Sequence, residues 1–303
     1  MRVLVLGARG QIARALSKVS SAAGVEIQAR GRPVLDLTRE ATIGDAISEV
    51  RPDIVINAAA YTAVDQAQID RKTAFAVNEF GAGAAARATE RAGLPLLHLS
   101  TDYVFDGRKS TPYTENDPTG PLSVYGESKL AGEIAVAQSH SRYLIVRTSW
   151  VFAEHGQNFV RTMLRLASRQ ETIRVVNDQW GSPTFADDVA HALLGLSSTI
   201  HSGTQNQADR IVHAAARGEA TWFSFAQAIL SGARTRGGPT ANVVAITSAE
   251  YTAQFGSASA MRPANSRLAS NTLEAHYGIQ LPKWQDGLER CLDRIAVAKW
   301  NLQ

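Results

Sequence analysis

The chain of 303 residues contains a single cysteine, Cys291, which excludes an intrachain disulfide and any metal site built from several cysteines. It also has no run of five or more like charges. Its 31 Lys and Arg residues are dispersed among 28 Asp and Glu residues, so nucleic-acid binding is not indicated. The N-terminal apolar stretch ends at Gly7, too early for a secretory signal or a membrane span. We therefore expect a cytoplasmic protein that binds neither nucleic acid nor membrane.

Apolar residues make up 45% of the chain, enough for a large core and two subdomains. Strand-like and helix-like segments alternate through the first half, which predicts an α/β fold with helices on both faces of a parallel sheet, the Rossmann-type doubly wound arrangement. The expected strands are 2–6, 25–29, 53–57, 96–100 and 143–147, and the expected helices are 11–23, 42–50, 72–92 and 124–138.

The pattern becomes mixed after about residue 150, where a loop at 231–239 is followed by short segments around 243–246 and 284–296. We expect residues 1–150 to form a dinucleotide-binding domain and residues 151–303 a smaller mixed α/β substrate domain. The boundary is expected to be discontinuous, since segments near 182–214 look able to return to the first sheet.

A glycine-rich turn directly follows the first expected strand. Gly7 allows the tight turn, and Gly10 lets a pyrophosphate approach the backbone N–H groups at the start of the next helix, where Gln11 and Ile12 stand. Ala13 provides a small residue for close helix–strand packing. The spacing is G-x-x-G-x-x-A rather than the usual G-x-G-x-x-G. It predicts a dinucleotide site.

The end of the second strand predicts which dinucleotide is used. An acidic residue there would hold a ribose 2′-OH, whereas Arg30 and Arg32 suit a 2′-phosphate. We therefore expect a preference for NADPH, with NADH possible. The alternative is that both are ordinary solvated loop arginines. Other expected cofactor contacts are Asp36 and Leu37 at the adenine, and Ala60, Tyr61 and Thr62 on the ribose side.

Tyr125 and Lys129 stand four residues apart and thus lie on one face of a predicted helix. An ammonium close to a phenol favours the phenolate, so we expect the pKa of Tyr125 to fall below its ordinary value of about 10. Such a tyrosine can donate a proton to a ketone during reduction, or act as a base in the reverse direction. The alternative is a chance Tyr-x-x-x-Lys pattern on an exposed helix.

Hydroxyl and carboxyl groups end the apolar strand that precedes this helix. Ligands in open α/β sheets bind beyond the carboxyl ends of strands, so Thr101 is expected to hydrogen-bond a substrate carbonyl beside Tyr125. The alternative is a strand-end or helix-capping cluster of Ser100, Thr101 and Asp102. Trp150, just past another strand end, is expected to form a wall of the substrate site. Trp222 is expected in the core.

Together, these motifs resemble the extended short-chain dehydrogenase/reductase superfamily and, within it, the dTDP-4-dehydrorhamnose reductase family. The resemblance covers nearly the whole chain, and it implies that Tyr125 is the acid/base, that Lys129 anchors the cofactor and that Thr101 assists at the sugar carbonyl. It also places Thr101, Asp102 and Trp150 against a sugar nucleotide. The segments that carry it are 57–65, 100–107, 125–133, 147–152, 178–184 and 262–266.

The activity implied by this resemblance is hydride transfer from a nicotinamide to C4 of dTDP-4-dehydro-L-rhamnose, giving dTDP-L-rhamnose for surface polysaccharide, with Tyr125 supplying the proton. Related 4,6-dehydratases carry an Asp-Glu pair where this chain has Asp102 and Tyr103, so plain reduction is favoured over dehydration. Two alternatives stay open: a non-catalytic NADP-binding regulatory subunit of the same fold, like that of methionine adenosyltransferase, and an epimerase or another sugar-nucleotide 4-ketoreductase.

Metal binding is not expected. Some members of the family bind Mg²⁺ at a dimer interface through acidic residues of the first helix, but Arg14, Ala15 and Leu16 offer no carboxylate here. Glu154 and His155 are adjacent and lack a third ligand spaced nearby. The oligomeric state is therefore left as monomer or homodimer, with a dTDP-sugar as the expected small-molecule partner.

Overall fold

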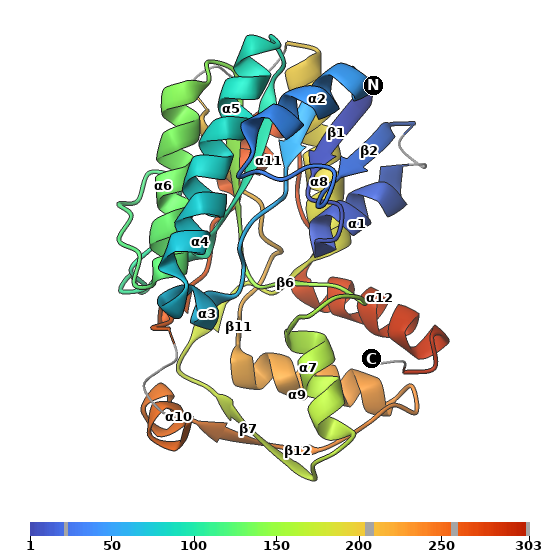
Figure 1. Cartoon of the computed structure of the whole chain (residues 1–303). Coiled ribbons are helices and arrows are strands. Elements are labelled where there is room, and N and C mark those ends of the chain that lie inside the picture. Colours follow the sequence, from blue (N-terminus) through green and yellow to red (C-terminus); the bar gives the residue numbers. More distant parts are fainter. Residues whose placement is uncertain (21–23, 204–208, 256–259, 301–303) are drawn as a thin grey trace.

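The computed structural model describes the whole chain except residues 21–23, 204–208, 256–259 and 301–303. Its main feature is a parallel sheet, which lies in the upper part of Figure 1. The six strands of this sheet follow the order β10-β5-β4-β3-β1-β2. Most of these strands are short runs of Val, Leu and Ile that are buried on both faces, as parallel sheets require. Their bounds are β1 Arg2–Leu6, β2 Glu26–Arg30, β3 Ile54–Asn57, β4 Leu96–Thr101, β5 Tyr143–Thr148 and β10 Ile211–His213.

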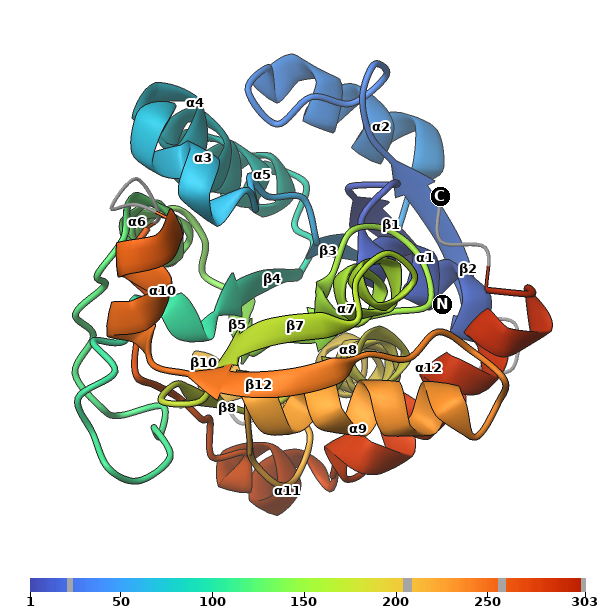
Figure 2. The same cartoon turned by 90° about the horizontal axis from the view of Figure 1, so that it is seen from below.

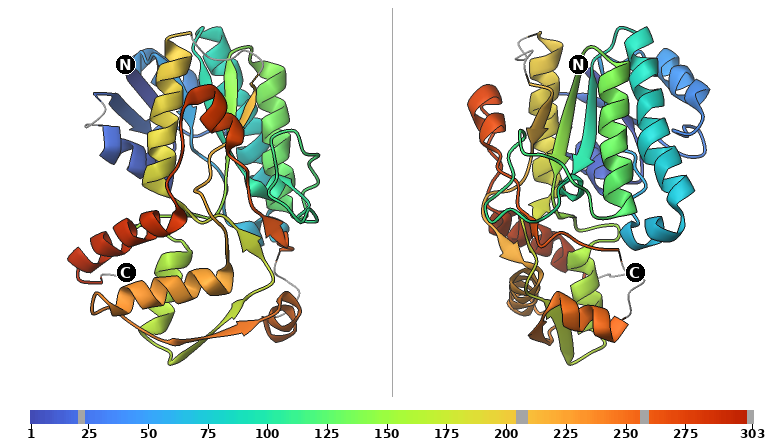
Figure 3. Two further views of the ribbon diagram at one scale, coloured as in Figure 1. Left: turned by 180° about the vertical axis from the view of Figure 1, so that it is seen from behind. Right: turned by 90° about the vertical axis from the view of Figure 1, so that its left-hand side faces the viewer.

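Helices cover both faces of this sheet, and the expected α/β doubly wound fold is confirmed. Figure 3 shows α8 and α6 on opposite sides of the strands. One apolar cluster lies between the sheet and α1 with α8, and another lies between the sheet and α2 with α5. The bounds are α1 Gln11–Val19, α2 Glu40–Val50, α5 Gly81–Arg91, α6 Val124–Ser139, α8 Ala186–His201 and α11 Asn271–Tyr277.

The helix expected over 72–92 is interrupted. α4 (Arg71–Phe75) is followed by a π-helical turn (Ala76–Phe80) before α5 begins, and a short α3 (Val64–Ile69) precedes it. Asn78 within the π turn donates from Nδ2 to the carbonyl oxygen of Tyr61 at 3.1 Å. The side chain is nearly fully buried. The wider turn therefore occurs where a polar side chain has to reach a neighbouring loop, a demand that helical periodicity does not reveal.

A second group of elements lies beyond one end of the sheet, around its own apolar cluster. Figure 2 shows its parallel pair, β7 and β12, side by side. Its strands are β7 Thr172–Val176, β8 Trp180–Gly181, β11 Ala220–Thr221, β12 Asn242–Ile246 and β13 Asn265–Ser266. Its helices are α7 Phe159–Ala167, α9 Trp222–Arg234, α10 Ser248–Phe255 and α12 Trp284–Val297.

The chain passes between the two groups several times. β6 (Val151–Phe152) pairs with β9 (Thr184–Phe185), after which α8 packs on α1 and β10 joins the edge of the large sheet beside β5. The loop expected at 231–239 begins later, because α9 continues to Arg234. Within the described residues, no helix is both long and apolar enough to cross a membrane.

Candidate active site

Thr101, Asp102 and Tyr125 come together where β4 ends and α6 begins. A 3₁₀ turn (Asp102–Val104) follows β4, and Thr101 caps it by accepting from the N–H of Tyr103. Ser123 caps the start of α6, and its hydroxyl accepts from the N–H of Gly126 at 3.2 Å. A Cβ on Gly126 would collide with the carbonyl oxygen of Tyr103. The glycine thus allows the start of α6 to lie directly against the turn.

Tyr125 is buried, and its ring meets that of Tyr103 edge-on at 5.5 Å between centroids. Burial raises the pKa of Tyr125 to about 12, and the negative charge of Asp102 acts in the same direction. A contact with the hydroxyl of Thr101 acts in the opposite direction. The expectation of a lowered pKa is therefore wrong for this structure, because loss of solvent around the phenolate outweighs nearby favourable groups. The hydroxyl is protonated at neutral pH.

Lys129 follows Tyr125 by one turn of α6 and is also buried. Its Nζ donates to the carbonyl oxygen of Leu99 in β4 at 2.7 Å. Burial lowers the pKa of Lys129 to about 8, and the negative charge of Glu133 opposes this shift. The ammonium is thus held at the carboxyl end of β4, on the same side of α6 as Tyr125.

Asp102 is almost fully buried, and its carboxylate accepts from the hydroxyl of Thr101 at 3.1 Å. Burial raises the pKa of Asp102 to about 6, although hydrogen bonds from Ser266 and other groups act to lower it. The carboxylate therefore orients the Thr101 hydroxyl. Two further hydroxyls at this edge, of Ser100 and Thr148, are buried with no hydrogen-bond partner in the described part of the chain.

The glycine turn between β1 and α1 packs closely against a neighbouring loop and leaves the start of α1 without a side-chain cap. Gly7 has φ of +108°, and a Cβ there would lie 2.9 Å from the backbone nitrogen of Ala59. Gly10 caps α1 without any side-chain hydrogen bond. Backbone N–H groups at the start of α1 are therefore available to an anion. Ile12 follows in the first turn of α1, half-buried against the core.

The sequence did not indicate that a distant loop holds Gln11. Asn158, at the start of α7, donates from Nδ2 to Oε1 of Gln11 at 2.9 Å and to the carbonyl oxygens of Ala153 and His155. The segment after β6 is thereby held against the first turn of α1. Only the tertiary fold reveals this contact, since nearly 150 residues separate the partners.

The two arginines after β2 have different surroundings. Arg30 donates to Glu49 at 3.1 Å and to Oε1 of Gln28 at 3.1 Å. Arg32 is exposed, on the segment that leads from β2 towards Asp36. Of the two guanidiniums, that of Arg32 is thus the less engaged by the protein itself.

The remaining expected cofactor residues lie in ordered loops at this edge of the sheet. The carboxylate of Asp36 accepts from the N–H and hydroxyl of Thr38, and these bonds lower its pKa. Leu37 is buried. The backbone of Tyr61 forms two hydrogen bonds with the buried side chain of Asn78: its N–H donates to Oδ1 at 2.8 Å, and its carbonyl oxygen accepts from Nδ2. These bonds fix the loop that contains Ala60 and Thr62, half-buried and exposed respectively.

Trp150 stacks on a second tryptophan that the sequence placed in the core. Its ring lies parallel to that of Trp222, with 3.4 Å between centroids, and both side chains are half-buried. A Cβ on Gly181 would overlap the Trp150 ring. The indole N–H of Trp222 donates to Gln179 at 3.2 Å. The two indole rings therefore form a stacked pair, in which Trp222 packs against Trp150.

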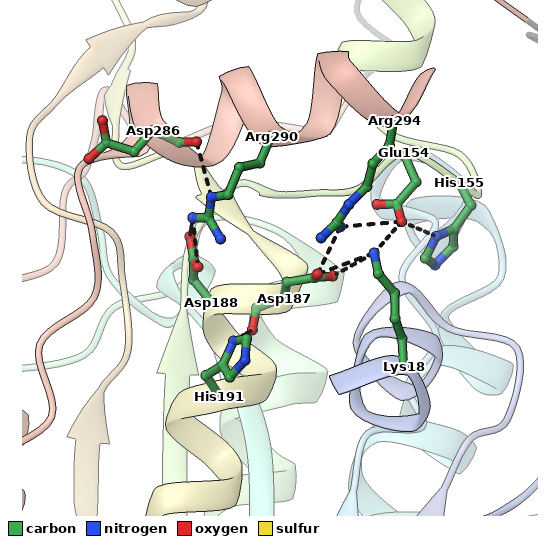
Figure 4. Close-up of polar contacts among 9 residues, drawn as sticks. All are labelled: Lys18, Glu154, His155, Asp187, Asp188, His191, Asp286, Arg290 and Arg294. Atoms are coloured by element: carbon green, nitrogen blue, oxygen red, sulfur yellow. Dashed lines mark hydrogen bonds and ion pairs between the residues drawn. The ribbon is translucent and has the colours of Figure 1, made fainter. Parts of the chain in front are cut away.

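An ion-pair cluster joins α1, α8, α12 and the loop after β6 (Figure 4). Asp187, almost fully buried, pairs with Arg294 at 2.7 Å and with Lys18 at 3.2 Å. The same two cations also pair with Glu154, and His155 lies 3.9 Å from that carboxylate. Both carboxylates near α1 are thus already neutralised by protein cations.

This arrangement does not suit the Mg²⁺ that some members of the resembled family bind at the first helix. A divalent ion needs carboxylates that are not already paired with cations. Among the residues that the structure describes, no group of three His, Cys, Asp or Glu side chains could hold a metal ion.

Comparison with known proteins finds similar proteins that align over nearly the whole chain. The sequence model of the RmlD substrate binding domain matches residues 1–297. A dTDP-4-dehydrorhamnose reductase from Sinorhizobium fredii is 46% identical over 290 residues, covering 96% of each chain, and one from Burkholderia thailandensis is 41% identical, covering 96% of this chain and 98% of the other. The crystal structure of dTDP-4-dehydrorhamnose reductase from Bacillus anthracis in complex with NADP superimposes with a TM-score of 0.87 at 36% identity, covering 97% of this chain and 99% of the other.

Proposed function

Since this chain belongs to the RmlD substrate binding domain family, we propose that it reduces the 4-keto group of dTDP-4-dehydro-L-rhamnose, with NADPH, to give dTDP-L-rhamnose. Relatives that carry this activity in their names align over nearly the full length of both chains. The observation that supports the proposal most directly is the convergence of Thr101, Tyr125 and Lys129 at the carboxyl end of β4.

The residues of the glycine turn fit a dinucleotide. The missing side chain of Gly7 lets the turn lie against the backbone of Ala59, and the N–H groups after Gly10, which no side chain caps, suit the pyrophosphate of NADPH. Gln11 and Ile12 lie in the same turn of α1. Bound NADPH would supply the hydride.

Tyr125 is the proposed proton donor. Because burial raises its pKa to about 12, its hydroxyl carries a proton at neutral pH and can transfer it to the sugar oxygen as that oxygen gains negative charge. Thr101 would donate to the same oxygen when its one hydroxyl proton turns from Asp102, to which it donates in this structure, towards the sugar. Trp150, supported by Trp222, would form the wall against which the sugar nucleotide lies.

Lys129 is the proposed anchor for the nicotinamide ribose. Its Nζ already donates one hydrogen bond to Leu99, so two further donors of an ammonium are available for ribose hydroxyls. Its positive charge would also stabilise the Tyr125 phenolate that forms once the proton has been transferred.

Preference for NADPH is assigned to Arg30 and Arg32. The exposed guanidinium of Arg32 would contact the 2′-phosphate directly. Arg30, paired with Glu49, would contribute mainly positive potential. On the adenine side we assign Asp36 and Leu37, and on the ribose side Ala60, Tyr61 and Thr62.

The proposal extends to the organisation of the chain. Residues 1–150, with the returning segments near 182–214, would bind the cofactor, and the rest of 151–303 would bind the sugar nucleotide between the two parts. We propose a cytoplasmic enzyme that works as a monomer or homodimer.

The test is to measure NADPH oxidation with enzymatically generated dTDP-4-dehydro-L-rhamnose and to identify the product by NMR. Rapid oxidation that yields dTDP-L-rhamnose is the expected result. Tight binding of NADPH without turnover would instead indicate a non-catalytic NADP-binding subunit. Turnover that yields a different stereoisomer would make the chain another 4-ketoreductase, and either result would overturn the proposal.

A further inference from the structure

A buried carboxylate continues the face of α6 that carries Tyr125 and Lys129. Glu133 follows Lys129 by four residues and Tyr125 by eight, so the three side chains project from one side of the helix. Glu133 is only 4% exposed. A carboxylate at this depth requires a partner, because an unpaired buried charge is strongly destabilising.

That partner is Arg147, on β5. Its Nε donates to Oε1 of Glu133 at 2.9 Å, and its Nη2 donates to Oε2 at 2.7 Å. Arg147 is 2% exposed, and its guanidinium carbon lies 5.1 Å from the centre of the Phe105 ring. The two parallel hydrogen bonds form a planar, bidentate contact with a defined orientation.

The position of this pair relates it to the reaction site. Arg147 lies opposite Ser100 in the pairing of β4 and β5, one residue before the Thr101–Thr148 pair. α6 is therefore attached to the sheet twice on its catalytic face, by Lys129 to the Leu99 carbonyl and by Glu133 to Arg147. Two attachments one helical turn apart fix both the rotation and the axial position of α6, and hence the place of Tyr125.

Glu133 also affects the pKa of Lys129 through its negative charge. Burial lowers the pKa of Lys129, and Glu133 is the acidic group that opposes this. From β4, His98 faces Lys129 but stays neutral, because burial holds its pKa well below the ordinary value. Tyr125 on the same helix is protonated at neutral pH, and Asp102 after β4 carries the remaining nearby carboxyl.

We propose that Glu133, held by Arg147, is a positioning residue for the reaction: it fixes the Tyr125–Lys129 face of α6 against β4 and β5 and places a carboxylate one helical turn from the Lys129 ammonium. The proposal rests on the proposed function in that Lys129 needs its charge to anchor the cofactor and to stabilise the phenolate. Arg147 has the complementary role of orienting the Glu133 carboxylate through its two hydrogen bonds.

The first test is the pH profile of kcat for Glu133→Gln, which keeps the shape of the side chain and removes its charge. Because Lys129 then loses its proton at lower pH, the alkaline limb of the profile is expected to move by about one pH unit towards acid, a tenfold loss of activity on that limb. The matched control is Glu127→Gln on the same helix, whose carboxylate forms an exposed pair with Arg71. In Glu127→Gln, the alkaline limb of the kcat profile is expected to lie at the same pH as in the unaltered chain.

Glu133→Gln leaves Arg147 as a buried cation without a counter-ion, so a second variant guards against misfolding. Glu133→Gln/Arg147→Met removes both charges and keeps apolar volume in the same space. In this double variant the alkaline limb is expected to remain shifted, since Lys129 still lacks its carboxylate. Folded variants whose profile is only scaled down, with the alkaline limb unmoved, would show a purely structural role and overturn the proposal.

NMR titration of the Lys129 ε-methylene separates this proposal from the proposed function. Its pKa is expected to be lower in Glu133→Gln than in the unaltered chain, whatever the substrate. Absence of turnover by the unaltered chain would contradict the proposed function alone. An unchanged Lys129 titration would contradict the role of Glu133 alone.

Discussion

Lys129, on α6, donates a 2.7 Å hydrogen bond to the backbone carbonyl oxygen of Leu99 in strand β4. In this arrangement the ammonium of Lys129 is held by the sheet, while the protonation of Tyr125 is governed by burial and by Asp102. The two residues of the Tyr-x-x-x-Lys pattern thus have separable tasks before the cofactor binds. Tyr125 keeps its hydroxyl proton at neutral pH, and Lys129 places a positive charge at the end of β4.

Tyr125→Phe is expected to lower kcat by about 10²–10⁴-fold, the usual contribution of a positioned proton donor. The affinity for NADPH should change little, because the ring and its contact with Tyr103 remain. Steady-state kinetics and a fluorescence titration of NADPH measure the two effects. Tyr143→Phe, on β5, serves as the control with normal turnover. Near-normal kcat in Tyr125→Phe would remove Tyr125 from the mechanism.

Gly7→Ala is expected to weaken NADPH binding by at least about tenfold and to destabilise the fold by about 1–3 kcal/mol. The reason is that the added Cβ meets the backbone of Ala59 and the positive φ disfavours any side chain. Gly44→Ala is the matched control. Gly44 lies within α2 with nothing within 4 Å of an added Cβ, so that variant should gain about 0.5–1 kcal/mol. Isothermal titration and urea unfolding distinguish the two outcomes.

Arg32→Ala is expected to raise the KM for NADPH by about tenfold and to leave the KM for NADH unchanged, since only NADPH carries the 2′-phosphate. Arg30→Ala should have a smaller effect, because Glu49 already neutralises much of that charge. Arg108→Ala provides an exposed arginine in another loop as the control. An equal change in the KM values for NADPH and NADH would show that neither arginine selects NADPH.

Asp102 contributes a pH-dependent cost to stability. Burial raises its pKa to about 6. The folded chain therefore binds more protons than the unfolded chain between the ordinary carboxyl pKa and about 6, and it loses stability as pH rises through that window. Relative to Asp102→Asn, the unaltered chain should be less stable at about pH 7 than at about pH 4 by up to about 3 kcal/mol. Urea unfolding of both proteins at the two pH values measures this difference, and a constant difference would contradict the raised pKa.

Removal of divalent ions is expected to leave the enzyme unaffected, because Lys18 and Arg294 already neutralise Glu154 and Asp187. Dialysis against EDTA should change neither kcat nor the melting temperature. Added Mg²⁺ should also have no effect. Loss of activity with EDTA that Mg²⁺ restores would point to a metal site that these contacts do not accommodate.

Much of the fold could be predicted from local patterns. β1 has the predicted bounds, and β3, β4 and β5 lie within about one residue of them, since short runs of Val, Leu and Ile followed by turn residues are local signals. The helix over 72–92 was predicted wrongly as one piece, because the π turn depends on the contact between Asn78 and Tyr61. That contact joins residues 17 positions apart.

Some features of the candidate site could likewise be predicted from the sequence, and others depend on the tertiary structure. The sequence alone determined that Tyr125 and Lys129 share a helix face and that Gly7 and Gly10 bracket a turn, because these relations depend only on spacing along one element. Tertiary structure decided the direction of the Tyr125 pKa shift, since desolvation depends on the segments that cover the phenol. It also decided the stacking of Trp150 on Trp222 and the pairing of Glu133 with Arg147. The partners in these contacts lie on different elements, and only the packing of those elements brings them within reach.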